Sequence, residues 1–319
     1  MSLQEGEQIA LNEMPRHTPY DGSTKPFTIA LKTLDPTDWI ELDADLETYL
    51  AEKDRLYATL PDKVFVEEPD THPAQREVLD MLAPYLVERF PETYRRNGTG
   101  IEIVGTSRHV ETSQPSLSPL RAASLLVPED LILMRRSDDG WRLAAGSLCF
   151  PSSWSLGEKF GRSLQDIHEP VPAFGRGTRT ADLIQRIFDN LAVEQPVQRF
   201  NWSLQAGNDL YLPFSHAQRI DRATNRPSKF SDDELAAQAF MRIERQTLRK
   251  LPNSRDILFT IRIYLDPLTV LSRHPDRASI AASFASQLAA LDEAQLDYKG
   301  LTADRDRLVA VLGKIAASS

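Results

Sequence analysis

The chain is poor in the residues and segments that several common kinds of protein require. Its 319 residues contain one cysteine, Cys149, which excludes an intrachain disulfide and any iron–sulfur cluster or zinc site built from several cysteines. No run of about 18 apolar residues is present, and the opening stretch, MSLQEGEQIALNEMPRHTPYDGSTKPF, lacks the charged and apolar regions of a signal peptide. We therefore expect a cytoplasmic protein with no membrane partner.

Common catalytic and nucleotide-binding signatures are missing as well. The chain has no G-x-x-x-x-G-K-[ST] loop, no G-x-G-x-x-G after a strand, no H-E-x-x-H and no G-x-S-x-G. The formal net charge is −9, so there is no basic surplus to bind a nucleic acid. With 41% hydrophobic and 26% charged residues, the composition indicates one large or two modest globular domains.

The order of the predicted elements favours an α+β fold. Residues 1–38 have no periodicity and are predicted to form a surface arm, with Tyr20 and Phe27 as possible anchors. The runs predicted as strands are rich in β-branched and aromatic residues: GIEIVG, DLILMRRS, WRLAAGSLCF, VQRFNWSLQ and DILFTIRIYL. Asp-Gly in RRSDDGWRL predicts one hairpin, and RKLPNSRDI predicts a second, which joins FMRIERQTLRKL to ILFTIRIYL.

Helical spacing of apolar residues predicts the remaining elements. The segments expected to be helical are a short helix between turns within DPTDWIELDADLETYLAEKDRLYATLPD, and the segments THPAQREVLDMLAPYLVERFP, SLGEKFGRSLQDI, RTADLIQRIFDNLAV, DRASIAASFASQLAALDEAQLDYKG and TADRDRLVAVLGKIAAS. A mostly antiparallel sheet with helices on one face follows from this order. We divide the chain into an arm (1–38), a main domain (39–300) and a C-terminal helix (301–319).

His168 has the most constrained surroundings of the histidines. It ends the predicted helix SLGEKFGRSLQDI, and Pro170 and Pro172 restrict the backbone just beyond it. A metal ligand benefits from such restraint. A histidine at a helix C-terminus can equally bond a carbonyl and interact with the helix dipole, and spacing alone favours this capping role. His216, which has apolar residues on one side and basic residues on the other, is the alternative pocket histidine.

Arginines are concentrated in the second predicted hairpin. If its two strands pair, Arg245 and Arg249 share one strand face and Arg262 lies across from them. Arginine chelates carboxylates in a bidentate manner, so these residues could bind an acidic ligand. The default alternative is that they form ion pairs on a solvated face, with Glu244, Asp256 or Asp266.

Aromatic residues lie near both regions. Arg199 and Trp202 share the predicted strand VQRFNWSLQ, and Phe150 and Trp154 come just before the predicted His168 helix. Such aromatic side chains could wall a flat apolar ligand, although they more commonly belong to a core.

Three segments taken together resemble a known family. GWRLAAGSLCFPSSWSLGEKFGRSLQDIHEPVPAF, PVQRFNWSL and RIERQTLRKLPNSRDILFTIRIYLDPL are similar to the haem-dependent oxidative N-demethylase alpha-subunit family. The resemblance spans roughly residues 30 to 300. Two motifs are distinctive when they occur together: Ile-His-x-Pro-Val-Pro and Arg-x-Glu-Arg-Gln-Thr-Leu-x-x-Leu-Pro.

The resemblance implies a fold, a cofactor and partners. The fold would be a PAS-like antiparallel sheet with flanking helices and a helical C-terminal extension, and the cofactor would be haem b. The reaction would be oxygen-dependent demethylation of a small secondary amine such as dimethylamine, which yields a primary amine and formaldehyde. Electrons would come from reductase or ferredoxin-like partner subunits that carry flavin and iron–sulfur centres, because this chain lacks the corresponding signatures.

The resemblance also suggests roles for individual residues. His168 is the histidine inside the matching motif, so we assign the haem iron to it. The residues expected to bind the rest of the haem are Arg245, Arg249 and Arg262 for the propionates, Arg199 in reserve, and Phe150 and Trp154 as walls. Those expected to receive the amine are Glu244, Trp202 and Tyr264. Cys149 has no cationic neighbour in the sequence and is expected to be a buried structural thiol rather than a thiolate ligand.

Two alternatives belong to other functional classes. A PAS-like haem protein can be a gas or redox sensor, and an interaction protein can keep the fold without haem. The colour of the purified protein separates the haem-free alternative from the other two. Amine-dependent formaldehyde release separates an enzyme from a sensor.

Overall fold

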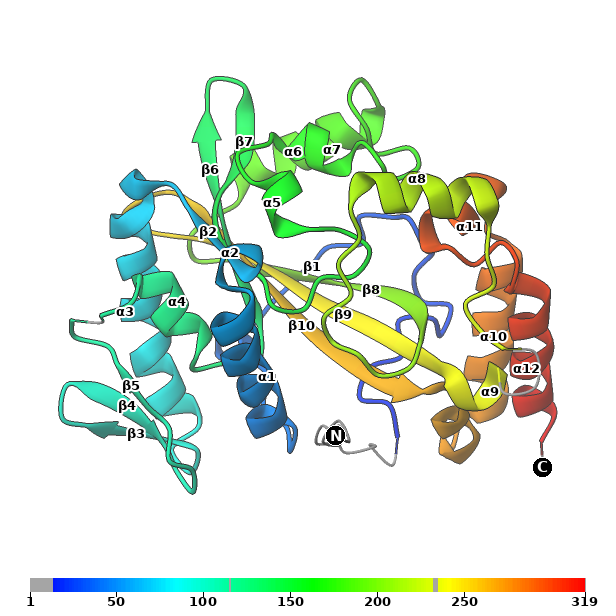
Figure 1. Cartoon of the computed structure of the whole chain (residues 1–319), viewed down its shortest axis with the longest axis horizontal. Helices are drawn as coiled ribbons and strands as arrows, with labels where there is room; N and C mark the ends of the chain where they lie inside the picture. The colour runs from blue at the N-terminus through cyan, green and yellow to red at the C-terminus, as the bar shows by residue number, and fades with distance from the viewer. Residues whose placement is uncertain (1–13, 115, 232–234, 319) are drawn as a thin grey trace.

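A long antiparallel sheet organises the chain. The computed structural model describes residues 14–114, 116–231 and 235–318; the first 13 residues of the predicted arm lie outside this part. Within it, the larger sheet has the strand order β1-β8-β9-β10-β6-β7-β2 (Figure 1). Its strands are β1 (Lys32–Thr33), β2 (Phe65–Glu67), β6 (Asp130–Ser137), β7 (Gly140–Ser147), β8 (Val197–Ala206), β9 (Ala239–Lys250) and β10 (Ile257–Pro267).

Both predicted hairpins are confirmed. Strands β6 and β7 pair antiparallel across a turn that ends in Gly140, whose φ of 105° suits glycine. Strands β9 and β10 pair along nearly their whole length, and Arg262 lies directly opposite Arg245 as expected. Because side chains alternate between faces, this register places Arg245, Arg249 and Arg262 on one face of the sheet.

Helices cover one face of the larger sheet and pack at both of its ends. The helices are α1 (Leu46–Thr59), α2 (Pro61–Val64), α3 (His72–Arg89), α4 (Pro119–Ser124), α5 (Leu156–Lys159), α6 (Leu164–His168), α7 (Arg179–Asn190), α8 (His216–Asn225), α9 (Leu235–Gln238), α10 (Arg277–Ala289), α11 (Glu293–Lys299) and α12 (Arg305–Ala317). Helices α5 to α8 cover one face, α10 to α12 pack at one end, and α3 and α4 lie at the other end (Figure 1). The mixture of helices and antiparallel strands confirms the α+β class.

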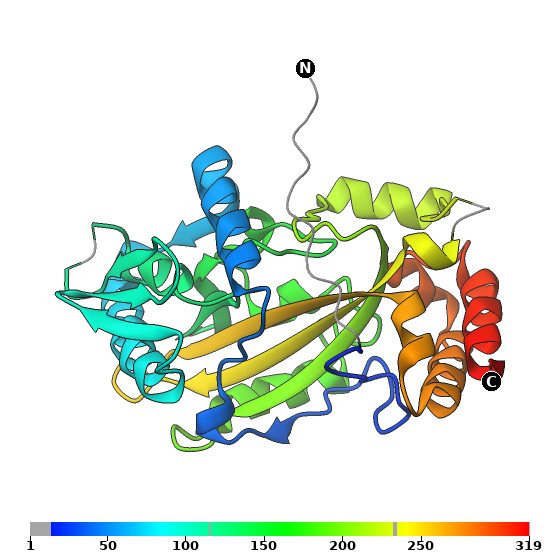
Figure 2. The same ribbon diagram turned by 90° about the horizontal axis from the view of Figure 1, so that it is seen from below.

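A smaller sheet and the N-terminal segment complete the fold. Strands β3 (Tyr94–Asn97), β4 (Gly100–Ile103) and β5 (His109–Glu111) form the smaller sheet beside α3. The N-terminal segment runs along the β8 edge of the larger sheet, where β1 pairs with β8 (Figure 2). Tyr20 is fully buried and stacks on Phe284 of α10 with ring centroids 4.2 Å apart, so the expected anchoring by Tyr20 is confirmed.

Two predicted helices are each broken into two. The segment SLGEKFGRSLQDI forms α5 and α6, because Phe160 is extended and Gly161 has a φ of 74°. Gly161 N and the carbonyl of Arg162 bond to Leu143 of β7, so the sheet edge holds the break open. The long tail helix breaks at Asp292, whose side chain forms a capping box with Gln295 at the start of α11.

The short helices α2, α4 and α9 were not predicted, and neither was the longer helix α8. Helix α8 begins after Ser215, and the Ser215 and Gln218 side chains form a capping box. This Ser-x-x-Gln signal is visible in the sequence and could have located the helix start. No helix in the described ranges is both long and apolar enough to cross a membrane.

Candidate functional site

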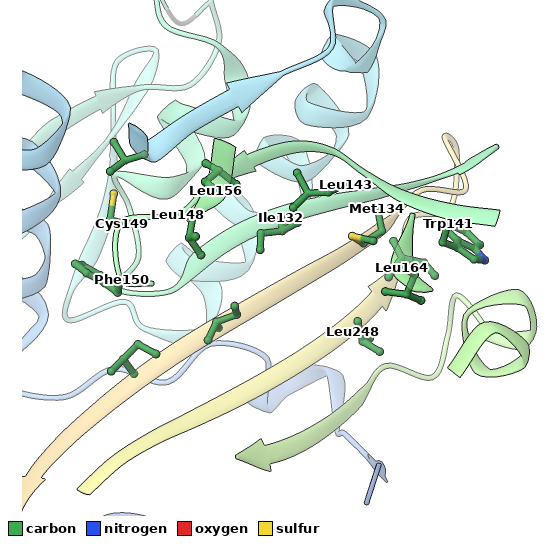
Figure 3. Close-up of a cluster of buried hydrophobic side chains, with 14 of the residues drawn as sticks. Ile132, Met134, Trp141, Leu143, Leu148, Cys149, Phe150, Leu156, Leu164 and Leu248 are labelled. Carbon is green, nitrogen blue, oxygen red and sulfur yellow. The ribbon is translucent and has the colours of Figure 1, made fainter. Parts of the chain in front are cut away.

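A cavity of about 620 Å³ lies between the sheet and helices α5 to α8. This volume is within the usual range for a cofactor or ligand site. Its wall is largely apolar, and Figure 3 shows part of it, with Ile132, Met134, Leu143 and Leu248 on strands and Leu164 on α6. Further apolar lining comes from Phe27, Ile29 and Leu31 of the N-terminal segment, Phe150, Trp154, Ile167, Val171, Phe174, Ile184, Ile187, Phe188, Phe259 and Ile261.

The alternation of the strands decides which of their side chains reach the cavity. On β9, Glu244, Gln246 and Leu248 line it, whereas the odd-numbered residues between them do not. On β8, Arg199 and Asn201 line it from positions opposite Gln246 and Glu244. The β8–β9 part of the wall is therefore polar, in contrast to the apolar part beside α6 and α7.

His168 lines the cavity as the last residue of α6. Its Nδ1 lies 2.8 Å from the carbonyl oxygen of Leu164; since a carbonyl only accepts, Nδ1 carries the proton. Nε2 then has a lone pair, and the described residues offer it no hydrogen-bond partner. Burial, assisted by the charge of Lys159, lowers the pKa of His168 to about 4, so the ring is neutral near pH 7. A neutral imidazole with one nitrogen bonded to a carbonyl and the other free is the usual form of a metal-ligating histidine.

The capping and ligand interpretations of His168 are therefore compatible. The bond to the Leu164 carbonyl is the one expected of a histidine at a helix C-terminus. The same bond orients the ring and leaves Nε2 available. In the part of the chain that the structure describes, no group of three His, Cys, Asp or Glu side chains could hold a metal ion. A metal at His168 would therefore need most of its ligands from a prosthetic group.

Five cations line the cavity. They are Lys159, Arg199, Arg222, Lys229 and Lys299, and Glu244 is the carboxylate among the described lining residues. Among the described residues, no carboxylate oxygen lies within 4 Å of the charged group of any of the five. Unpaired buried charges are unfavourable, so this arrangement favours an acidic ligand.

Three of these cations gather around the end of α11. Lys229 Nζ donates to the carbonyl of Lys299 at 2.7 Å, and Arg222 approaches the carbonyl of Gly300 at 3.5 Å. Burial and the charges of Arg222 and Lys299 hold the pKa of Lys229 well below its usual value. We call Arg222, Lys229 and Lys299 the basic group.

A second polar group surrounds Glu244. Its Oε2 accepts hydrogen bonds from Gln246 at 2.8 Å and, more weakly, from Asn201 at 3.4 Å. Arg199 donates through Nη2 to the carbonyl of Thr28 at 3.2 Å, while its Nε is buried without a partner. Lys159 lies over the ring of Trp154 at 4.0 Å, and burial with the charge of Arg219 lowers its pKa to about 7.

The structure brings together only some of the predicted site residues. His168, Phe150, Trp154, Arg199 and Glu244 line the same cavity. The others lie outside its lining: Trp202, Arg245, Arg249, Arg262 and Tyr264. The three hairpin arginines share one strand face as predicted, but the cavity is on the opposite face of the sheet.

The hairpin arginines have structural partners on that opposite face. Arg245 donates to the carbonyls of Trp39 and Asp38 at 2.9 and 2.6 Å. Arg262 bonds Asp43 at 2.7 Å, and Arg249 stacks over the Trp39 ring at 4.6 Å. These contacts correct the expectation that the three side chains meet a ligand beside His168, because each is already engaged by the segment between β1 and α1.

The two aromatic residues expected at the amine site are also engaged elsewhere. Tyr264 donates a short hydrogen bond to Glu41 on the far face of the sheet. Trp202 packs edge-on against Phe284 of α10, with ring centroids 4.9 Å apart. Only Glu244 of the three amine candidates reaches the cavity.

Two further expectations concern His216 and Cys149. His216 is exposed at the start of α8 and is absent from the cavity lining. Cys149 is fully buried, and burial together with the charge of Asp130 raises the pKa of its thiol. Cys149 is therefore a structural thiol, as expected.

Sequence reasoning missed four of the five cavity cations, Lys159, Arg222, Lys229 and Lys299. They come from separate segments between residues 159 and 299 and share no motif. The capping box of α8 would have placed Arg222 on a helix, but nothing in the sequence directs that helix to the cavity.

The cavity thus combines a neutral histidine with a free Nε2, a largely apolar wall and a basic group at its edge, which is a combination compatible with a metal-bearing, acidic prosthetic group. The family described as haem-dependent oxidative N-demethylase, alpha subunit-like, has a sequence model that matches residues 30–309. The chain belongs to this family.

Proposed function

We propose that this chain is the haem-bearing subunit of an oxidative N-demethylase, with haem b in the cavity between the sheet and helices α5 to α8. The observation that carries the proposal is His168, which is neutral, oriented by its bond to Leu164 and free at Nε2. We regard the antiparallel sheet with helices over the cavity face as a PAS-like core.

The walls of the cavity suit a flat apolar ligand. Phe150 and Trp154 provide aromatic surface, and side chains of β6, β7, α6 and α7 provide aliphatic surface. His168 would hold the haem iron through its free Nε2. Phe27, Ile29 and Leu31 of the N-terminal segment contribute to the same lining, so this segment helps to exclude water.

The basic group would hold the haem propionates. Arg222, Lys229 and Lys299 gather at one place on the lining and have no carboxylate partners among the described residues. This assignment replaces the hairpin arginines, which are bound to Asp43 and to backbone carbonyls on the other face. Charge-assisted hydrogen bonds from these cations to carboxylates would favour one orientation of the ring.

Glu244 would receive the amine. Its carboxylate is oriented through Oε2 by Gln246 and Asn201, whereas Oε1 has no hydrogen-bond partner in the described residues. A secondary ammonium group can donate to Oε1, which would position the N-methyl group. The substrate would be a small secondary amine, with dimethylamine as its simplest form.

The remaining chemistry comes from outside this chain. When bound, haem supplies oxygen activation. Two electrons would come from reductase or ferredoxin-like partner subunits that carry flavin and iron–sulfur centres. The chain itself would hold the haem, orient the amine through Glu244 and keep the site dry.

The first experiment is an absorption spectrum of haem-reconstituted protein, wild type beside His168→Ala, before and after dithionite. We expect a Soret band in the wild type that is lost or displaced in the variant. A matched control is His216→Ala, which removes an exposed histidine and should leave the spectrum unchanged. An unchanged spectrum in His168→Ala would remove His168 as the ligand, and no band in the wild type would overturn the haem proposal.

A second assay tests the reaction. Haem-loaded protein, supplied with a ferredoxin and its reductase, is incubated with dimethylamine and oxygen. Formaldehyde release that depends on the amine would support an enzyme. Oxygen binding without formaldehyde from any secondary amine would instead indicate a sensor.

A further inference from the structure

The charges of the cavity bear on the kind of amine that it accepts. Five cations line it against the single carboxylate of Glu244 among the described lining residues. If haem is bound as proposed above, its two propionates offset two further positive charges. Burial lowers the pKa of Lys229 and brings that of Lys159 to about 7, so Arg199 remains as a charged side chain with no carboxylate within 4 Å among the described residues, which is unfavourable in a largely apolar cavity.

A simple alkylammonium ion offers Arg199 no partner, because it brings a positive charge and only Glu244 attracts it. A carboxylate on the same substrate cancels the charge of the ammonium group and can pair with a cation that the propionates leave free.

Arg199 is the cation best placed for that group. The basic group lies around the backbone of Lys299 and Gly300, and its three cations suffice for two propionates. Arg199 lies instead on β8, directly opposite Gln246 and two positions from the partner of Glu244. A guanidinium and a carboxylate thus lie on adjacent strands of the same cavity wall.

Arg199 also has unused hydrogen-bonding capacity. Nη2 bonds the carbonyl of Thr28, but the buried Nε has no partner. Buried donors in native structures nearly always have a partner, so an unpaired one indicates a missing acceptor. Lys159, the remaining basic side chain of the cavity lining, lies over the Trp154 ring.

We propose that the substrate is an N-methylated amino acid, with its ammonium on Glu244 and its carboxylate on Arg199. This inference rests on the proposed function. The reaction would convert the N-methyl amino acid, O2, two electrons and two protons into the amino acid, formaldehyde and water. One oxygen atom enters a methyl C–H bond, the C–N bond of the resulting carbinolamine breaks, and the other oxygen atom leaves as water; a reductase partner supplies the electrons.

The test compares two ligands that differ in the carboxylate. Calorimetry on haem-loaded protein measures the affinity for N-methylglycine and for N-methylpropylamine. We expect N-methylglycine to bind at least roughly tenfold more tightly, since a charged hydrogen bond contributes this much or more. Equal affinities, or tighter binding of N-methylpropylamine, would overturn the inference.

Variants test which residues cause the preference for N-methylglycine. Arg199→Gln should weaken N-methylglycine binding roughly 10- to 100-fold and leave N-methylpropylamine unchanged, whereas Glu244→Gln should weaken both. Arg186→Gln, on the exposed side of α7, is the matched control and should change neither. If Arg199→Gln does not fold, Arg199→Lys keeps the charge but loses the planar guanidinium, and it should weaken N-methylglycine alone. Equal weakening of both ligands by the Arg199 variant would contradict the assignment.

Failure of this inference is distinguishable from failure of the proposed function. Formaldehyde from dimethylamine but no preference for N-methylglycine would refute only the carboxylate-bearing substrate. Absence of a Soret band, or of formaldehyde from every secondary amine, would refute the proposed function itself.

Discussion

Glu41→Gln is predicted to destabilise the fold and to leave haem binding intact. Glu41 lies on the sheet face opposite the cavity, where it accepts hydrogen bonds from His17 at 2.8 Å and from Tyr264. Its other oxygen lies 3.3 Å from Arg245 Nε. Burial alone would raise the pKa of Glu41, but the His17 hydrogen bond and the charge of Arg245 outweigh it and lower the pKa from 4.5 to about 2.

The size and sign of the effect follow from that shift. The shift is about 2.5 pH units, so at about 1.36 kcal/mol per unit the ionised carboxylate contributes roughly 3 kcal/mol. A folded-state pKa below the unfolded value means that this stabilisation is fully present above pH 4.5 and is lost as the pH falls towards 2. Glu41→Gln should therefore cost roughly 3 kcal/mol at pH 7 and about half of that near pH 3.3.

Urea unfolding at the two pH values measures this difference. Glu88→Gln, at an exposed position of α3, is the matched control and should cost less than about 0.5 kcal/mol. Haem affinity of Glu41→Gln should stay within about twofold of wild type, because Glu41, Arg245 and Tyr264 do not line the cavity. A cost that is the same at both pH values would refute the electrostatic argument, and a large loss of haem affinity would refute the assignment of these residues to structure.

Two further predictions concern buried lysines. Lys299→Gln should weaken haem binding roughly 10- to 100-fold in a titration of apoprotein, because Lys299 is proposed as one charged partner of a propionate; an affinity within about twofold of wild type would exclude Lys299 from this role. Lys53→Met should lower the free energy of unfolding by roughly 1 to 3 kcal/mol, since the fully buried Lys53 Nζ donates to the carbonyls of Ser124, Val127 and Glu129, which lose this donor. A loss below about 1 kcal/mol in urea unfolding would contradict the second prediction.

Turn residues and the periodicity of apolar residues predicted the secondary structure correctly where no contact with a distant segment competes with them. The Asp-Gly turn and the alternating runs around it were sufficient for the β6–β7 hairpin, because turn geometry sets the register of its strands. The break between α5 and α6 was missed, since it depends on two hydrogen bonds with Leu143 of β7, one donated by Gly161 N and one accepted by the Arg162 carbonyl. A continuous apolar pattern in the sequence does not reveal such a competing bond.

The candidate site was predictable in part. His168 was found because Pro170 and Pro172 mark a stiff corner after a predicted helix, and because the matching motif contains this histidine. Glu244, Arg199, Phe150 and Trp154 were also named from the sequence and line the cavity. The basic group was missed because its members come from α8, the segment after it and α11, which meet only in the folded chain.

By itself, the sequence determined the α+β class, the long β9–β10 hairpin and the sharing of one strand face by Arg245, Arg249 and Arg262. Each of these follows from local periodicity or turn chemistry. Which face of that hairpin borders the cavity was decided by tertiary structure alone. Side chains alternate between the two faces of a strand, so local periodicity does not distinguish one face from the other. Helices α5 to α8 pack over one face and residues 34–45 pack against the other. As a result, Glu244 lines the cavity and Arg245 has a structural role.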